Sequence, residues 1–220
     1  MNRISIRDNR FTELIGTDEV PIDSNVYEGV VINAAPISRA YYGGQYDSDK
    51  PAPPTCWSSS TQTPSVDVPQ EQRQAARCLD CSNNIRGSGF GSSRACRFSQ
   101  RLAVVPIDRL EDVYQLRLPA TSIFGEPRDD NMPMQAYARF LHGRDTVVST
   151  VLTKIYFDID SSIPKLFFKP IRSLRDEELS VVSDMIKHPD TIQAITLDYA
   201  PLESSTTSPF EVTDGFEINN

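Results

Sequence analysis

Alternating hydrophobic and polar positions predict a series of β-strands from residue 101 onward. Segment 113–120, VYQLRLPA, places apolar side chains on one face and polar ones on the other, as in a half-buried strand. Segments 101–107 and 147–160 are rich in β-branched and aromatic residues, which favours extended structure. The apolar segment 165–171 follows the short connection SSIP, so it is expected to pair with 147–160 as a hairpin. A further strand is predicted at 26–33.

Apolar residues spaced three and four positions apart predict two helices. Within 132–143, the apolar side chains share one face. Segment 175–188 has acidic residues in its first turn and basic ones in its last, which suits the helix dipole. Ser173 is its candidate N-cap, and Pro189 is expected to end this helix or to start another.

The order of these elements predicts a mainly β fold with two helices. About five antiparallel strands with one helix between them suit a small Greek-key barrel of the oligonucleotide-binding (OB) type, although other mixed α+β sheets have the same pattern. We expect residues 1–200 to form this OB-like domain, with a cysteine-rich insertion at 52–98. After Tyr199 the sequence is dominated by Ser, Thr, Pro and acidic residues, so 201–220 is expected to be a flexible acidic tail.

Charge is distributed unevenly in this chain of 220 residues, which has a net charge of −8. Residues 82–107 contain four arginines and no acid, whereas residues 188–220 contain six acids and no Lys or Arg. No apolar stretch approaches the ~20 residues needed to cross a bilayer, and the N-terminus lacks the apolar core of a signal peptide. We therefore expect a cytoplasmic protein, in the host cytoplasm if its source is viral, with no membrane partner and with reduced thiols.

Four cysteines lie in the insertion, at Cys56, Cys78, Cys81 and Cys96. The short gap between Cys78 and Cys81 lets two thiolates at a tight turn reach one metal ion, and Cys56 and Cys96 can complete a tetrahedral site. Four thiolates leave no open position for water, so the expected Zn²⁺ is structural. The segment is too polar to form its own core, and a metal would supply the missing stability. Four ordinary buried thiols, or a disulfide or redox pair at Cys78 and Cys81, are the alternatives.

The segment between Cys81 and Cys96, SNNIRGSGFGSSRA, combines glycines, hydroxyls and arginines. Glycine allows close approach of the backbone, arginine suits phosphate oxygens, and aromatic rings can stack on bases. The candidate nucleic-acid contacts in this loop and the strand that follows are Arg86, Phe90, Arg94, Arg97, Phe98 and Arg101. The alternative is a solvated loop whose arginines serve only their own domain.

The predicted hairpin offers a second candidate surface. Alternation assigns one face to the core, and the opposite face carries Lys154, Tyr156, Lys165, Phe167 and Lys169. Rings among lysines are typical of surfaces that bind single-stranded nucleic acid, because bases stack on the rings and ammonium groups follow the backbone. Cross-strand aromatic pairing that only stabilises the sheet is the alternative.

The acidic tail contains aromatic residues that a merely solubilising segment does not need. Its candidate docking residues are Phe210, Glu211, Asp214, Phe216 and Glu217. This pattern suits a short segment that binds a basic, apolar groove on a partner protein. It also suits a segment that covers the chain's own cationic face until nucleic acid displaces it, and an inert end is the remaining alternative.

Two stretches, CWSSS…CLDCSNNIRGSGFGSSRACRFSQRLAVVPID and LTKIYFDIDSSIPKLFFKPI, resemble parts of phage-encoded proteins that have no firmly assigned role. The expected barrel, the zinc-held insertion, the aromatic and basic strands and the acidic, aromatic C-terminus together resemble the single-stranded DNA-binding proteins of tailed bacteriophages, and the resemblance covers about residues 52–188. The resemblance implies a protein that coats exposed strands during DNA replication and recombination and recruits replication proteins such as polymerase or helicase through its tail. The zinc region departs from the class, because its four cysteines have no histidine near them.

An enzyme is not expected from this sequence. His142 and His188 have no paired nucleophile nearby, and GSGFG lacks the Lys-Ser/Thr of a phosphate-binding loop. No pair of carboxylates suggests general acid and base roles. The sequence therefore favours binding of single-stranded DNA without strong sequence preference. The alternative is a zinc-containing protein-interaction factor, such as a transcription regulator or an inhibitor of a host complex.

Overall fold

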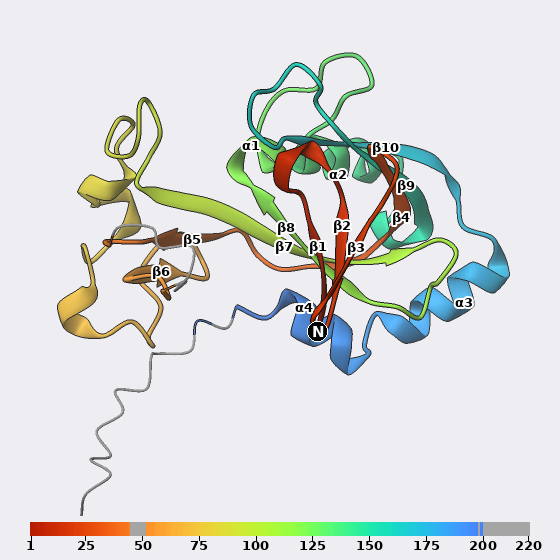
Figure 1. Ribbon diagram of the computed structural model, residues 1–220, viewed down its shortest axis with the longest axis horizontal. Helices are drawn as coiled ribbons and strands as arrows, with labels where there is room; N and C mark the ends of the chain where they lie inside the picture. Colours follow the sequence, from red (N-terminus) through yellow and green to blue (C-terminus); the bar gives the residue numbers. More distant parts are fainter. Residues whose placement is uncertain (45–51, 198, 200–220) are drawn as a thin grey trace, which may run out of the picture.

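A curled, mixed β-sheet forms the centre of the molecule, of which the computed structural model describes residues 1–44, 52–197 and 199 (Figure 1). Its strands are β1 (Asn2–Ser5), β2 (Thr12–Ile15), β3 (Asp18–Pro21), β4 (Val26–Ala34), β7 (Cys96–Pro106), β8 (Tyr114–Pro119), β9 (Val151–Phe157) and β10 (Leu166–Ser173). Their order along the curl is β10-β9-β4-β7-β8-β1-β2-β3. Neighbours are antiparallel except β1 and β8, which run parallel. The result is a half-barrel with a concave and a convex face.

Helices cover both faces of this half-barrel. They are α1 (Ala120–Ile123), α2 (Met134–His142), α3 (Asp176–Met185) and α4 (Pro189–Ile195). Inside the curl, α1 and α2 share a core with Tyr114 and Phe168, whereas α3 and α4 pack on the convex face with Val30 and Ala103. The mainly β class is confirmed, but the expected count of two helices is wrong. The sequence pattern missed α1, which is only one turn long, and Pro189 starts the separate helix α4. Within the residues that the structure describes, no helix is long and apolar enough to cross a bilayer.

A smaller sheet extends from one end of β7 and forms an arm beside the half-barrel (Figure 1). It consists of β5 (Ser38–Tyr41), β6 (Cys56–Ser58) and the first residues of β7, with β5 in the middle. Short 3₁₀ turns follow β6 at Gln70–Gln72, Cys78–Asp80 and Ser82–Asn84, and two others lie at Arg7–Asn9 and Val148–Thr150. Trp57 packs with Ala40 and Val68, and the segment after α4 returns to place Leu197 and Tyr199 against them. The arm therefore has a small apolar core of its own.

The predicted strands correspond to β4, β7, β8, β9 and β10. The predicted hairpin pairs Phe168 with Ile155, and both side chains are buried in the core. β7 begins earlier than its pattern indicates, because β5 supplies a partner for its first residues. The N-cap of α3 is Arg175 and not Ser173, since the Arg175 backbone N–H donates a hydrogen bond of 2.8 Å to the Glu178 carboxylate.

The N-terminal strands β1, β2 and β3 are not predicted by the sequence pattern. Each has four residues, and β2 carries Glu13, whose charged side chain is buried. The Arg109 guanidinium and the Tyr114 hydroxyl donate hydrogen bonds to its carboxylate, at 2.8 and 3.1 Å. These partners lie far away in the sequence, so the local pattern shows a polar segment where the fold has a buried ion pair.

Candidate nucleic-acid interface and cysteine cavity

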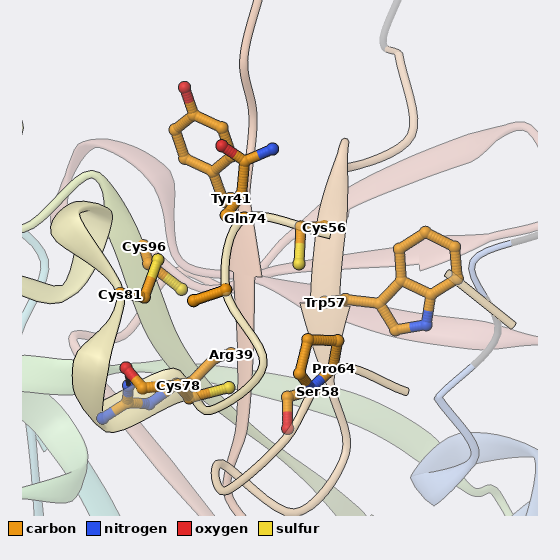
Figure 2. A pocket seen from close by; sticks show the side chains of 11 residues that line it. Arg39, Tyr41, Cys56, Trp57, Ser58, Pro64, Gln74, Cys78, Cys81 and Cys96 are labelled. Atoms are coloured by element: carbon orange, nitrogen blue, oxygen red, sulfur yellow. Dashed lines mark hydrogen bonds between the residues drawn. The ribbon is translucent and has the colours of Figure 1, made fainter. Parts of the chain in front are cut away.

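The arm brings the four cysteines together from distant parts of the chain. Tyr41 on the central strand β5 is the register partner of Cys56 on β6 and of Cys96 on β7, so both cysteines project from one face of this sheet. The 3₁₀ turns add Cys78 and Cys81, and all four side chains line a cavity of about 20 Å³. Figure 2 shows them arranged around this space. A cavity of this size has room for about one water molecule or one small ion.

The four thiols line this cavity, but their side chains are not arranged as a metal centre in the structure. Each of the four is a free cysteine. Across residues 1–44, 52–197 and 199, no three His, Cys, Asp or Glu side chains are close enough to hold a metal ion. The donor set nevertheless suits zinc in number and chemistry, since structural sites commonly use four cysteine thiolates. The zinc site stays a prediction.

Burial raises the pKa of two of these thiols, Cys56 and Cys96, and a neighbouring donor or positive charge opposes each rise. Burial is the main cause that raises the pKa of Cys96 to about 11, while the Arg39 guanidinium opposes the rise and the other thiols add to it. Burial also raises the pKa of Cys56, and a hydrogen bond from the Gln74 backbone opposes that change. A deprotonated cluster at this place therefore depends on nearby donors and positive charge.

Arg39 is a buried cation in the wall of the cavity. It is 8% exposed, its Nη1 donates a hydrogen bond of 3.3 Å to the Cys78 carbonyl, and its guanidinium lies 4.1 Å from the centroid of the Phe98 ring. Its Nε is buried without a hydrogen-bond partner, and it forms no ion pair with any carboxylate that the structure describes. Phe98 also contacts Phe124, with centroids 5.2 Å apart, so the ring predicted to stack on a base is largely occupied by the protein itself.

The Gly-Ser-Arg loop of the arm is closed by its own hydrogen bonds. The backbone N–H groups of Gly87 and Gly89 donate to the Ser93 carbonyl, and the Ser93 hydroxyl donates to the Phe90 carbonyl at 2.7 Å. A Cβ on Gly89 would lie 2.9 Å from the backbone carbonyl carbon of Arg94, so this close approach of two backbone segments requires glycine. Phe90 is 95% exposed. The predicted contacts Arg86, Arg94 and Arg97 are exposed as well and take part in no ion pair with a described residue.

The aromatic residues of the β9–β10 hairpin are largely committed to the fold. Phe167 and Tyr156 are cross-strand partners with ring centroids 6.0 Å apart, and Phe167 is 7% exposed. The Tyr156 hydroxyl donates a hydrogen bond of 2.6 Å to Asn131 Oδ1. This is the geometry of an aromatic pair that stabilises a sheet, and it leaves little ring surface for a base.

The lysines of the same hairpin are mostly neutralised. Lys165 Nζ lies 2.6 Å from the Asp158 carboxylate, and Lys169 Nζ lies 2.6 Å from that of Asp130. Lys154 Nζ lies 5.4 Å from the centroid of the Tyr156 ring. Because two of the three lysines already have acidic partners, the hairpin is a weaker candidate for phosphate binding than the sequence indicates.

A wide basic groove, which the sequence pattern does not predict, lies beside α4. It has a volume of about 1280 Å³ and is lined mainly by residues of β1, β7, β8 and α4. Its cations are Arg3, Arg7, Arg101, Arg117 and Lys187, and its acidic residue is Asp190. None of these five cations belongs to an ion pair within the described part of the chain. The groove is thus strongly positive in a protein whose net charge is −8.

Two of the groove arginines oppose each other directly in the sheet. Arg101 on β7 and Arg117 on β8 are antiparallel register partners. Like charges at such positions destabilise a sheet, and an anionic ligand between them would relieve that cost. Sequence reasoning selected Arg101 but missed Arg117, although the alternation in VYQLRLPA already placed Arg117 on the polar face of its strand. The missing information was the pairing of the two strands.

The predicted docking residues of the acidic tail, 210–217, lie outside the described residues. The last described residue, Tyr199, has its ring 5.6 Å from that of Trp57 in the arm. The Arg101 guanidinium lies 5.4 Å from the centroid of the same tyrosine ring. The described chain therefore ends where the arm meets the basic groove.

Comparison with known proteins gives this chain no relatives. No protein-family model matches it, and no similar curated protein or solved structure was found.

Proposed function

We propose that this protein binds single-stranded DNA without strong sequence preference and that the basic groove is its main contact surface. The observation that carries the proposal is the set of five groove cations with one acid among them. Such cations follow a phosphate backbone whatever its sequence. Arg97 and Arg101 lie on the same side of β7, so the positive surface continues from the groove toward the arm.

The strand order supports an OB-type barrel as the underlying architecture. β4, β7 and β8 are successive antiparallel neighbours with the arm inserted after β4, and β9 returns beyond α1 and α2 to pair with β4. The spatial order β9-β4-β7-β8 is that of a Greek key. In OB folds, the face of the second and third strands and the loop after the first strand bind oligonucleotides. The corresponding parts here are β7 and β8, which carry Arg101 and Arg117, and the arm.

The proposed role is to coat exposed strands during phage-type DNA replication and recombination. The arm loop, with the exposed Phe90 ring, would add stacking contacts to the phosphate contacts of the groove. The acidic tail would recruit replication proteins such as polymerase or helicase, or would compete with DNA for the groove.

A structural zinc ion belongs to this proposal. Cys56, Cys78, Cys81 and Cys96 would hold one Zn²⁺ in the cavity that they line, and the ion would tie the 3₁₀ turns to the small sheet of the arm. This role is one of positioning: it fixes the loop that carries Phe90 relative to β7.

Equilibrium binding to a fluorescent oligo(dT) tests the proposed function. We expect fluorescence anisotropy to rise at low salt for the full chain, and also for a chain that ends at Tyr199. Arg117→Glu is expected to weaken binding strongly, because it places an acid in the centre of the groove. The matched control is Arg139→Glu, an equal change of charge at an exposed position on α2. Absence of binding by both chain lengths at low salt would refute the proposal.

A second candidate function, a zinc-containing protein-interaction factor, is favoured by the apolar surface of the arm. Val66, Leu79, Ile85 and Phe90 are 64% to 95% exposed, which is unusual for large apolar side chains in one small unit. If the oligo(dT) experiment fails while the arm variant Phe90→Ser loses binding to a partner protein, this second function replaces the first.

A further inference from the structure

We propose that Arg39 is the counter-charge of the four-cysteine metal site and that its positive charge increases the affinity of the site for zinc. The proposal rests on the zinc site of the preceding section and is independent of DNA binding. Arg39 contacts the site from the sheet side and does not supply a ligand atom, so its role is one of positioning and charge.

The net charge of the expected site creates the need for a cation. One Zn²⁺ with four thiolates carries a net charge of −2, and burying such a charge is unfavourable unless positive or hydrogen-bonding groups surround it. Cys56, Cys78 and Cys81 are each 8% exposed. Among the described residues that line the cavity, Arg39 is the cation. Arg39 therefore lies where it can supply the positive charge that the occupied site would need.

Arg39 itself also lacks a partner of opposite charge among the described residues. A guanidinium that is 8% exposed is normally paired with an acid, yet Arg39 has no carboxylate partner in the part of the chain that the structure describes. Its Nε has no hydrogen-bond partner, and its remaining contacts are the Cys78 carbonyl and the Phe98 ring. Negative charge on the neighbouring sulfurs would supply what these contacts do not.

The fold places Arg39 next to the ligands from two directions. On β5, Arg39 stands two positions before Tyr41 and so projects from the same face, and Tyr41 is the register partner of both Cys56 and Cys96. The hydrogen bond from Nη1 to the Cys78 carbonyl then connects Arg39 to the turn that carries the other two cysteines. Arg39 thus projects from the same face of the sheet as Cys56 and Cys96, lines the same cavity, and is hydrogen-bonded to the turn that carries Cys78.

Zinc affinity of charge-altered variants tests the proposal on the full-length protein. The measurement is competition with a chromophoric chelator, with Arg39→Met to remove the charge and Arg39→Lys to keep it. Residues that support metal ligands typically change metal affinity about 10- to 100-fold when altered, so we expect a loss of that size for Arg39→Met. Arg39→Lys is expected to keep most of the affinity. Arg139→Met on α2 is the matched control and is expected to bind zinc like the unaltered protein.

Two results would overturn the proposal. Equal affinity of Arg39→Met and the unaltered protein would show that the charge does not matter. Equal losses in Arg39→Met and Arg39→Lys would show that shape and hydrogen bonding, and not charge, account for Arg39. If Arg39→Met does not fold, Arg39→Gln replaces it with the same expectations, since it keeps a donor for the Cys78 carbonyl.

A separate readout distinguishes failure of this inference from failure of the zinc site itself. Co²⁺ bound by four thiolates gives visible bands typical of tetrahedral sulfur coordination. We expect these bands in the unaltered protein and, at higher Co²⁺ concentration, unchanged bands in Arg39→Met. If the unaltered protein binds no metal, both the zinc site and the proposed role of Arg39 are wrong. If it binds metal normally and Arg39→Met binds equally well, only the proposed role of Arg39 is wrong.

Discussion

Removal of three exposed groove cations is expected to weaken single-strand binding and to flatten its dependence on salt. The change is Arg3→Gln, Arg117→Gln and Lys187→Gln together, which leaves Arg7 and Arg101 in place. The three altered side chains are exposed, and none belongs to an ion pair with a described residue. Substitutions at such positions usually change stability by less than about 0.5 kcal/mol, so the fold is expected to persist.

The size of the effect follows from the number of cations. Each phosphate contact with a single strand contributes about −0.7 to the slope of log affinity against log salt concentration. Arg3, Arg7, Arg117 and Lys187 are exposed and together predict a slope of about −2.8, whereas Arg101 is only 7% exposed and is not counted. In the variant, Arg7 is the exposed groove cation that remains, and it predicts a slope of about −0.7. Between ~50 and ~200 mM salt, the affinity should fall roughly 50-fold for the unaltered protein and about threefold for the variant.

Fluorescence anisotropy with oligo(dT) over a salt series gives both slopes. The matched control changes three exposed arginines outside the groove to Gln: Arg128, Arg139 and Arg144. Its slope is expected to stay near that of the unaltered protein. Equal slopes for the groove variant and the unaltered protein would show that the three altered cations make no phosphate contacts. A control variant that loses as much slope as the groove variant would show that only total charge matters.

Three further predictions concern stability and the tail. Arg117→Gln alone is expected to raise the free energy of unfolding by ~0.2–1 kcal/mol in the absence of DNA, because it removes a like-charge cross-strand pair, and thermal unfolding of the variant measures this. Arg172 and Arg175 hold the pKa of Glu178 well below its usual range, so this stabilisation is present at neutral pH and is lost as the pH falls below about 4.3 toward the folded-state value. Glu178→Gln should therefore lower the free energy of unfolding by ~1 kcal/mol at pH 7. Denaturant unfolding over a pH series should show that the variant loses less stability than the unaltered protein as the pH falls. Equal losses in the two proteins would contradict the role given to Glu178. Deletion of 201–220 is expected to tighten oligo(dT) binding if the acidic tail competes for the groove, and unchanged affinity would leave partner recruitment as its role.

Much of the central sheet is predictable from sequence because its strands separate apolar from polar faces locally. The β9–β10 hairpin shows this well: Ile155 and Phe168 lie on the core side, and Lys154 and Lys169 are cross-strand partners on the other. The N-terminal strands do not have this property, since β2 buries Glu13 against Arg109 and Tyr114. A buried charge whose partners come from a distant segment leaves no local signal.

The candidate sites divide in the same way. Spacing alone pointed to Cys56, Cys78, Cys81 and Cys96, and the fold brings them to one cavity although the structure forms no metal centre there. The counter-charge Arg39 has no comparable signal, because its contact with the cysteines depends on the pairing of β5 with β6 and β7.

The basic groove is the feature of the structure that the sequence predicts least. Its cations come from β1 and the turn after it, from β7 and β8, and from the short connection between α3 and α4. They meet only because β1 runs parallel to β8 and α4 packs against β7. Aromatic and basic alternation on the hairpin was easier to see, yet the structure pairs Lys165 and Lys169 with Asp158 and Asp130. Local composition identifies charged residues but not whether the fold neutralises them.

NMR mapping of the DNA contacts tests whether single-stranded DNA binds in the basic groove. Backbone amide shifts of the ¹⁵N-labelled full chain, with its zinc content determined beforehand, would be followed as oligo(dT) is added at low salt. Binding in the groove predicts that the largest shifts occur in β1, β7 and β8 around Arg3, Arg101 and Arg117, and at the start of α4. Shifts confined to the β9–β10 hairpin, or no shifts at all, would contradict it.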